Sequence, residues 1–233
     1  MPDADAAPAG PPRHLLVRGN RKLGESIHGW SIPAVDSCPG RSELCERHCY
    51  ARSGHFGLAN VKDRLQENLD AALAQGFERR VAREVRRRRV HTLRVHVAGD
   101  FFSPEYTRKW LRIAQRCPAT TFYAYTRSWR VAELAPVLAE LAALPNVRLW
   151  YSADQETGMP PERPPGVEVA YLQTEPGEDI PEGVGVIFRL RHLRRERRAR
   201  VGLAVVCPTE TGLRRAAEHT CTSCGRCYQP KGG

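Results

Sequence analysis

The segment Leu93-Arg94-Val95-His96-Val97-Ala98-Gly99-Asp100 gives the clearest indication of the fold. Its apolar and polar side chains alternate from Leu93 onward, which predicts a β-strand that ends at Gly99. Residues 104–116 follow with the spacing of an amphipathic helix, and Ser103 stands at the position of a helix N-cap. A strand followed directly by a helix is the repeating unit of a parallel α/β sheet.

Similar units extend on both sides of this segment. Further strands are expected at 15–17, 121–126, 147–151, 167–172, 184–190 and 203–206, and helices at 63–90, with an interruption near Gly76, and at 132–144. Strands and helices therefore alternate through the middle of the chain. This pattern predicts an α/β fold, a partial (β/α) barrel of about six strands, with a mixed open sheet as the alternative.

The 233 residues divide into three parts. Residues 1–13 are rich in Ala and Pro and are expected to form a disordered lead, without the basic and apolar regions of a secretory signal. Residues 14–206 form the expected barrel, and residues 207–233 form a cysteine-rich, metal-binding extension. No apolar run approaches the length of a bilayer, so we expect a cytoplasmic protein that does not enter the membrane.

Cysteine is the most informative residue type, because seven of the eight cysteines fall into two groups. In a reducing compartment such groups bind metal more often than they form disulfides. The second group contains the C-x2-C-x2-C spacing of ferredoxins, which predicts a 4Fe-4S cluster, with a four-thiolate zinc site as the alternative. Its expected ligands are Cys207, Cys221, Cys224 and Cys227.

The first group, Cys38, Cys45 and Cys49, supplies only three thiolates. Three thiolates on a four-iron cluster leave one iron without a protein ligand, as in metal sites that react rather than only stabilise. The alternative is a zinc site completed by His48 or His55. The eighth cysteine, Cys117, is expected to be a buried structural residue.

The order of these features resembles the core of radical S-adenosylmethionine enzymes. Cys49-Tyr50-Ala51 closes a three-cysteine loop, a helix follows, and the next strand ends in Ala98-Gly99-Asp100 at the place of that family's Gly-Gly-Glu-like motif. The resemblance implies a radical-SAM-like fold and a 4Fe-4S cluster on the first cysteine group. It also implies S-adenosyl-L-methionine at the open iron, with its amino group received by Gly99 and Asp100.

The chain from Gly19 to Cys227 more closely resembles the phage-type gene product 88 family. The matching stretches are Gly19-Asn20-Arg21-Lys22-Leu23-Gly24, Cys38-Pro39-Gly40, Cys49-Tyr50-Ala51, His96-Val97-Ala98-Gly99-Asp100-Phe101-Phe102, Tyr125-Thr126-Arg127-Ser128-Trp129 and the C-terminal cysteines. This combination is specific. It implies the radical-SAM-like fold but supplies no reaction.

Polar residues at the ends of the expected strands are candidates for cofactor binding, because barrels of this kind place their sites there. Asp100 is expected to bind an ammonium group, or else to cap the following helix. Arg127 is expected to hold a carboxylate or phosphate, or else to form a salt bridge. Ser152 and Asp154 are expected to bind ribose hydroxyls, or else to form a turn. Tyr50 and Gly99 complete the set, and His96 either lines the barrel interior or belongs to the core.

The formal net charge is +10, with dense arginine at 79–89 and 189–200. We interpret the first segment as a solvated helix face and the second as the better candidate for phosphate contacts. A polyanionic partner, a nucleic acid or nucleotide, is therefore one hypothesis for the substrate.

These observations lead to three hypotheses of function. The first is a radical SAM-type enzyme with two 4Fe-4S clusters, an unknown substrate and an electron donor such as ferredoxin or flavodoxin. The second is a non-catalytic basic protein, held together by zinc or iron–sulfur sites, that binds nucleic acid. The third is an iron–sulfur enzyme in which the open iron acts on substrate as a Lewis acid.

Overall fold

A seven-stranded sheet with the strand order β1 to β7 forms the centre of the computed structural model, which describes residues 14–195, 205–210 and 219–229. The strands are β1 (Val17–Asn20), β2 (Gly24–Gly29), β3 (Thr92–Val95), β4 (Thr121–Thr126), β5 (Val147–Ala153), β6 (Glu168–Gln173) and β7 (Val184–Arg189). The strands β1 and β2 pair antiparallel, and every later pair is parallel. The fold is therefore a mixed α/β fold, and the strand pairs of the described residues do not join β7 back to β1.

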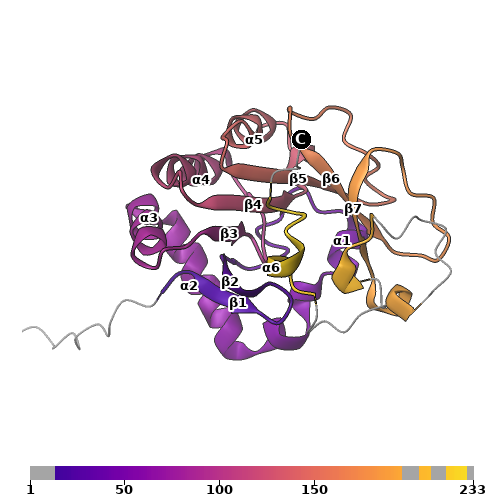
Figure 1. Ribbon diagram of the computed structural model, residues 1–233, viewed down its shortest axis with the longest axis horizontal. Coiled ribbons are helices and arrows are strands. Elements are labelled where there is room, and N and C mark those ends of the chain that lie inside the picture. The colour runs from indigo at the N-terminus through magenta and orange to yellow at the C-terminus, as the bar shows by residue number, and fades with distance from the viewer. Residues whose placement is uncertain (1–13, 196–204, 211–218, 230–233) are drawn as a thin grey trace, which may run out of the picture.

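Helices cover the outer face of this sheet (Figure 1). The long ones are α2 (Ala59–Leu73), α3 (Phe77–Arg87), α4 (Pro104–Arg116) and α5 (Ala135–Ala142). The largest buried cluster lies between them and the sheet and includes Trp30, Phe77, Trp110 and Leu138. Shorter elements are α1 (Glu43–Arg47), α6 (Cys221–Cys224) and the 3-10 helices η1 (Tyr50–Arg52), η2 (Gly54–Gly57), η3 (Ser128–Arg130), η4 (Arg191–Arg195) and η5 (Pro208–Glu210).

Two local predictions are confirmed. Gly76 interrupts the expected helix at 63–90, because its φ of 79° is left-handed, and α2 and α3 form on either side of it. Ser103 caps α4, since its Oγ accepts a hydrogen bond of 3.1 Å from Tyr106 N.

Other boundaries differ from the sequence-based expectations. The strand expected through Ala98 ends at Val95, because His96 has a left-handed φ of 60°. The sheet has seven strands rather than about six, since the turn-rich segment at 19–24 forms the β1–β2 hairpin, in which Asn20 Oδ1 accepts hydrogen bonds from the amides of Lys22 and Leu23. The helix expected at 132–144 extends only over α5.

Alternation of strand and helix also stops at β5. Loops without a regular helix join β5 to β6 and β6 to β7. Of the strand expected at 203–206, only 205 and 206 lie in the described residues, and Val206 forms an isolated bridge with Ile187. The lead at 1–13 and the basic residues 196–200 lie outside the described residues.

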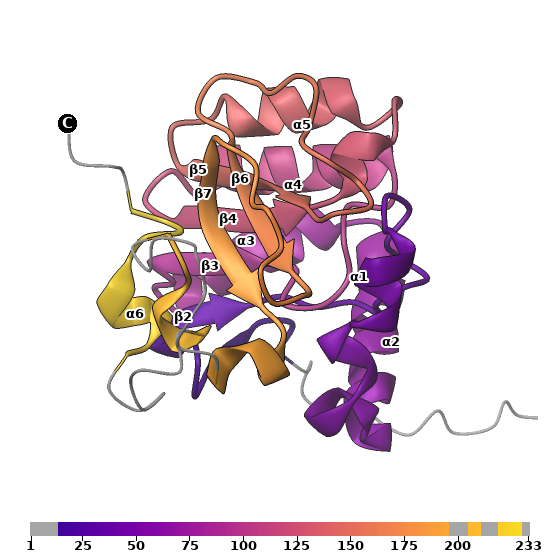
Figure 2. The same cartoon turned by 90° about the vertical axis from the view of Figure 1, so that its right-hand side faces the viewer.

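The C-terminal cysteine segment packs on the inner face of the sheet, opposite the long helices (Figure 2). Cys221 N and Thr222 N donate hydrogen bonds of 2.8 and 3.0 Å to the carbonyls of Lys22 and Leu23, which attaches the start of α6 to the turn between β1 and β2. Trp150 Nε1 donates a hydrogen bond of 2.9 Å to Cys227 O. No helix in the described ranges is both long and apolar enough to span a membrane.

Candidate metal centres

The three N-terminal cysteines lie in the loop that leaves β2, at the carboxyl ends of the parallel strands. Their thiols are half-buried. Burial, the Asp100 carboxylate and the thiols of Cys45 and Cys49 together raise the pKa of Cys38 to about 12. The three cysteines are therefore grouped on one loop at this edge of the sheet, with Cys38 beside the Asp100 carboxylate.

Residues at the ends of β4 and β5 fasten this loop. Ser42 caps α1 by accepting a hydrogen bond of 3.0 Å from Cys45 N, and its hydroxyl donates to Asp154 Oδ2 over 2.6 Å. Asp154 is fully buried and pairs with the Arg127 guanidinium at 2.7 Å. Its other oxygen accepts from the amides of Glu156 and Thr157 at 3.0 Å each. The Asp154 carboxylate therefore joins the cysteine loop to the sheet.

Arg127 is the second fastening group. It is buried beneath the loop. Burial raises the pKa of the Cys45 thiol, and the Arg127 guanidinium opposes this shift. The loop crosses so near that a Cβ added at Gly40 would lie 2.0 Å from the Arg127 carbonyl oxygen. Arg130 Nη1 donates hydrogen bonds of 2.9 and 3.0 Å to the carbonyls of Gly40 and Arg41. Only glycine fits at position 40 without moving backbone.

Asp100 holds the end of β3 to the end of β4. Its two carboxylate oxygens accept hydrogen bonds from Phe101 N at 2.7 Å and Arg127 N at 2.9 Å. Burial raises the pKa of Asp100 to about 6, although hydrogen bonds from Thr126, Arg127 and Phe101 oppose this shift. The predicted alternative role as cap of α4 belongs to Ser103 instead.

Gly99 lies directly against the chain that leads into the first cysteine. Its φ is 85°, and an added Cβ would lie 2.3 Å from Ile32 Cγ1 and 2.8 Å from Ser37 Oγ. Gly99 thus permits the close approach of two loops.

Tyr50 and Ser152, the two remaining candidates for cofactor binding, differ from the buried groups. Tyr50 is 56% exposed and its hydroxyl donates to Val97 O, whereas Ser152 is half-buried on β5.

The structure brings together Asp100, Arg127 and Asp154 around the cysteine loop and leaves His96 in the core. His96 Nε2 lies 2.9 Å from the Tyr106 hydroxyl, and its ring packs edge-on against Phe101. Burial and the nearby Arg94 lower the pKa of His96 to about 3.

The remaining His and Cys candidates differ in burial. His48 and His55 are exposed. Cys117 is buried at the end of α4, where its thiol lies 3.9 Å from Ala82 O.

The four C-terminal cysteines form the second group. Burial and the thiols of Cys207, Cys221 and Cys224 raise the pKa of Cys227 to about 11, while a hydrogen bond from Tyr125 opposes the shift. Burial also raises the pKa of Cys221, and the cations of Arg94 and Lys22 oppose it. Cys207 and Cys227 pack beside Trp150, and Cys221 and Cys227 pack beside Tyr123, so three of the four predicted ligands lie against the inner face.

Both groups offer only thiolates, a soft donor set that suits iron–sulfur clusters or zinc. In the part of the chain that the structure describes, no three His, Cys, Asp or Glu side chains form a ready-made site for a single metal ion.

Sequence reasoning missed several residues around these centres: Ser42, Arg94, Tyr123, Tyr125 and Arg130. A signal for Arg94, Tyr123 and Tyr125 exists, since strand alternation places them opposite the apolar residues that face the helices.

Fold and cysteine geometry together define a mixed α/β protein with one thiol group at the carboxyl edge of its parallel strands and a second on the inner face. Residues 14–230 match the family described as Gene product 88, and the chain belongs to this family. It is similar to the Gene 88 protein of Mycobacterium phage L5, with 29% identity over 180 residues that cover 72% of this chain and 70% of the relative. The Gene 88 protein of Mycobacterium phage D29 is 27% identical over 231 residues, covering 92% and 88%. No solved structure matches the chain.

Proposed function

We propose that this protein is an iron–sulfur enzyme of the radical SAM type. In this proposal Cys38, Cys45 and Cys49 hold a 4Fe-4S cluster with one open iron, and the C-terminal cysteines hold an auxiliary cluster. The observation that carries the proposal is the three-thiol loop at the carboxyl edge of six consecutive parallel strands, where barrel-like folds place their reactive sites.

The residues that surround the loop support this assignment. Arg127, Asp154 and Asp100 are committed to internal contacts that fix the loop on β3, β4 and β5. Rigid support from outside the ligand set is what a reactive metal site requires. The three thiolates are soft donors that suit an iron–sulfur cluster, and this is the reason to prefer it over a zinc site completed by His48 or His55, whose side chains are exposed.

The chemistry of the proposed reaction comes from the cofactors. A 4Fe-4S cluster held by Cys38, Cys45 and Cys49 would supply the one-electron reduction of S-adenosylmethionine to methionine and a 5′-deoxyadenosyl radical, the species that would abstract hydrogen from substrate. This chain's part is to hold the thiolates and to present polar groups to the cofactor. Exposed Tyr50 and half-buried Ser152 are the predicted cofactor contacts whose side chains remain accessible.

Anaerobic incubation of the reconstituted protein with dithionite and S-adenosylmethionine tests the proposal. We expect 5′-deoxyadenosine from the wild-type chain and none from a chain with Cys38, Cys45 and Cys49 changed to Ala. A chain with Cys117→Ala serves as the matched control, because Cys117 lies apart from both groups. A loaded cluster that yields neither 5′-deoxyadenosine nor a spectral change with the cofactor would refute this function and favour Lewis-acid chemistry at the open iron.

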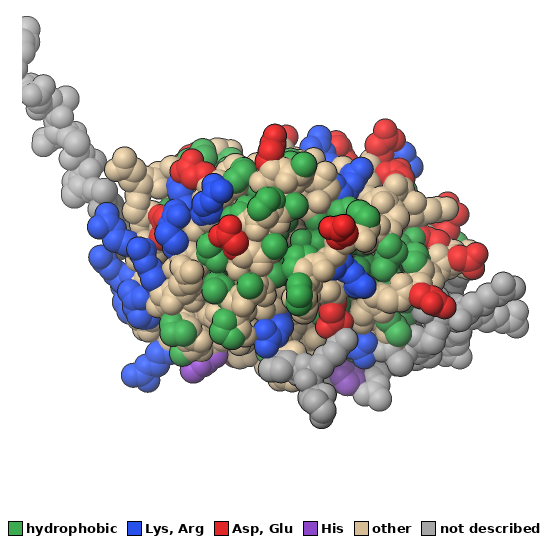
Figure 3. All heavy atoms as spheres, turned by 90° about the horizontal axis from the view of Figure 1, so that it is seen from above, with side chains coloured by type: hydrophobic (Ala, Val, Ile, Leu, Met, Phe, Trp, Pro, Cys, Tyr) green, Lys and Arg blue, Asp and Glu red, His purple; other side chains and the backbone are tan. Residues whose placement is uncertain are grey.

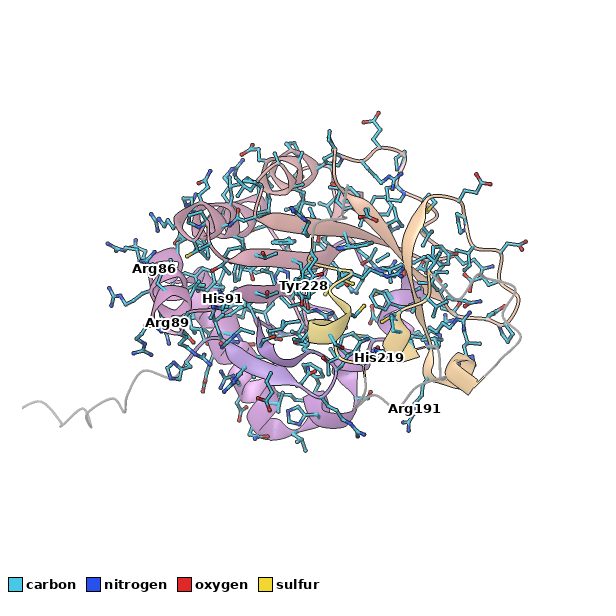
Figure 4. All side chains as sticks on the ribbon, in the orientation of Figure 1. Arg86, Arg89, His91, Arg191, His219 and Tyr228 are labelled. Carbon is cyan, nitrogen blue, oxygen red and sulfur yellow. The ribbon has the colours of Figure 1, made fainter. Side chains whose placement is uncertain are left out.

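A second candidate function, binding of nucleic acid, is favoured by the exposed face of α3. Arg79, Arg83, Arg86 and Arg87 are exposed there. Figure 3 shows Lys and Arg gathered at one end of the visible surface, and Figure 4 shows Arg86 and Arg89 at the outer edge, far from Tyr228 on the inner face. Such a cluster attracts phosphates in a salt-dependent manner.

Fluorescence anisotropy with a labelled DNA duplex tests this second candidate. Arg83→Glu should weaken binding and flatten its dependence on salt, whereas Arg163→Glu, the same charge change at an exposed loop position, should have a smaller effect. Equal effects of the two substitutions would mean that DNA binding depends only on the net charge of the protein.

A further inference from the structure

Polar side chains of the inner face converge on the C-terminal thiols. Arg94 of β3 and Tyr123 of β4 are partners across the parallel strands, so their side chains are neighbours on one face of the sheet. Tyr125, two residues further along β4, shares this face, and the Arg94 guanidinium lies 5.2 Å from the centre of its ring. Figure 4 shows Tyr228 over these strands, and its ring centre is 5.6 Å from that of Tyr123.

Two of these groups are donors without an acceptor. Tyr123 is 2% exposed, and its hydroxyl forms no hydrogen bond to any described residue. Arg94 Nε is likewise buried without a partner, although Arg94 Nη2 lies 3.5 Å from the Tyr50 hydroxyl. Among the ion pairs of the described residues, none joins Arg94 to a carboxylate. Because buried donors are nearly always paired, an acceptor is expected beside them.

Two of the C-terminal cysteines pack in the same region as these donors. Cys221 and Cys227 pack against the small cluster that Tyr123 forms with Leu23 and Ile27. Tyr125 packs against the same cluster as Cys221 and Cys227. Burial raises the pKa of Cys221, and the Arg94 cation opposes that shift. The cation, two hydroxyls and the thiols therefore occupy one buried region.

We propose that Arg94 and Tyr123 donate hydrogen bonds to the sulfur atoms of the C-terminal metal centre and tune its reduction potential. This inference rests on the proposed function, because it concerns the auxiliary cluster. Hydrogen bonds to cluster sulfurs and a nearby positive charge favour the more negative, reduced state and so raise the potential. Lys22 adds less charge, since Glu210 binds its ammonium group at 2.7 Å.

Tyr123→Phe is the most selective test, because it removes only the unpaired hydroxyl. Tyr171→Phe is the matched control: Tyr171 is equally buried, but its hydroxyl donates to Glu178 over 2.8 Å. In the metal-free protein, Tyr123→Phe should leave the urea midpoint unchanged or raise it, because an unpaired buried hydroxyl is lost. Tyr171→Phe should lower the midpoint, since Glu178 loses a donor.

In the metal-loaded protein, Tyr123→Phe should be the variant with the changed property, and that property is the reduction potential. A potentiometric titration followed by electron paramagnetic resonance should show the C-terminal centre, identified as the signal that persists in Cys49→Ala, shifted to lower potential in Tyr123→Phe. A shift of about tenfold in the reduction equilibrium, which is 59 mV for one electron, is the size expected. Arg94→Gln should shift the potential in the same direction, and Tyr171→Phe should not shift it.

Potentials of Tyr123→Phe and Arg94→Gln that equal the wild-type value would overturn the inference while leaving the proposed function intact. If the C-terminal site binds zinc instead of iron, the proposed function loses its auxiliary cluster. The rate at which a chelator removes the zinc then tests whether Tyr123 is a donor to the site. Release about tenfold faster in Tyr123→Phe would support the donor role. An unchanged rate would reject it.

Discussion

Asp154→Asn isolates the charge that fastens the cysteine loop. The side chain keeps its shape, and its carbonyl oxygen can still accept from the amides of Glu156 and Thr157. However, the buried Arg127 guanidinium, 2.7 Å from Asp154 Oδ2, loses its counter-charge. Breaking a buried ion pair on one side costs about 3–5 kcal/mol. We use about 3 kcal/mol, the lower end of that range.

Urea unfolding of the metal-free protein measures this loss. With a slope of about 2 kcal/mol per molar urea, the midpoint should fall by about 1.5 M. The exposed Asp70→Asn is the control and should stay within about 0.5 kcal/mol of wild type. An Asp154→Asn midpoint that matches the control would refute the claim that this carboxylate anchors the loop.

Three further substitutions test individual features of the structure. Gly40→Ala should lower the free energy of unfolding in urea by about 1–3 kcal/mol and release the iron of the first centre, because the added Cβ would lie 2.0 Å from Arg127 O. Gly57→Ala is the control and should be neutral, since its Cβ meets nothing within 4 Å. Equal effects of the two substitutions would contradict the close approach of Gly40 to Arg127. Burial holds the pKa of His96 at about 3, so below pH 6.5 the unfolded chain binds a proton that the folded chain does not, and stability falls as pH falls. His96→Asn, which tolerates a left-handed φ, should remove up to about 1.4 kcal/mol per pH unit from that acid slope, and an unchanged slope would place the titration elsewhere. Ser103→Ala should lower the unfolding free energy by about 1 kcal/mol, and no change would mean that the cap of α4 does not contribute.

The sequence predicted those elements whose signals are local. Alternating side chains identify β4 and β5 because one face packs on helices and the other faces inward. The cap at Ser103 and the break at Gly76 follow from the chemistry of single residues. In contrast, β3 ends at Val95 because His96 has a left-handed backbone. The His96 side chain contacts Tyr106 in the core, and the alternation of apolar and polar residues does not predict that contact.

The sequence indicates which cysteines belong together, but it does not indicate which residues hold their loop in place. Spacing identifies Cys221, Cys224 and Cys227 as neighbours because they are close in the chain. The role of Asp154 differs, since its partner Ser42 is 112 residues away and no local pattern predicts that contact. Asp154 was expected to bind a ligand, and the structure adds its internal contact with the cysteine loop.

Iron counting on anaerobically reconstituted protein, with and without the first cysteine group, shows whether the chain holds two separate clusters. We expect about eight irons in the wild-type chain and about four after Cys38, Cys45 and Cys49 are changed to Ala, with the absorption of the second cluster retained. Zinc at the first group of the wild-type chain, completed by His48 or His55, would leave the proposed radical chemistry without an electron source.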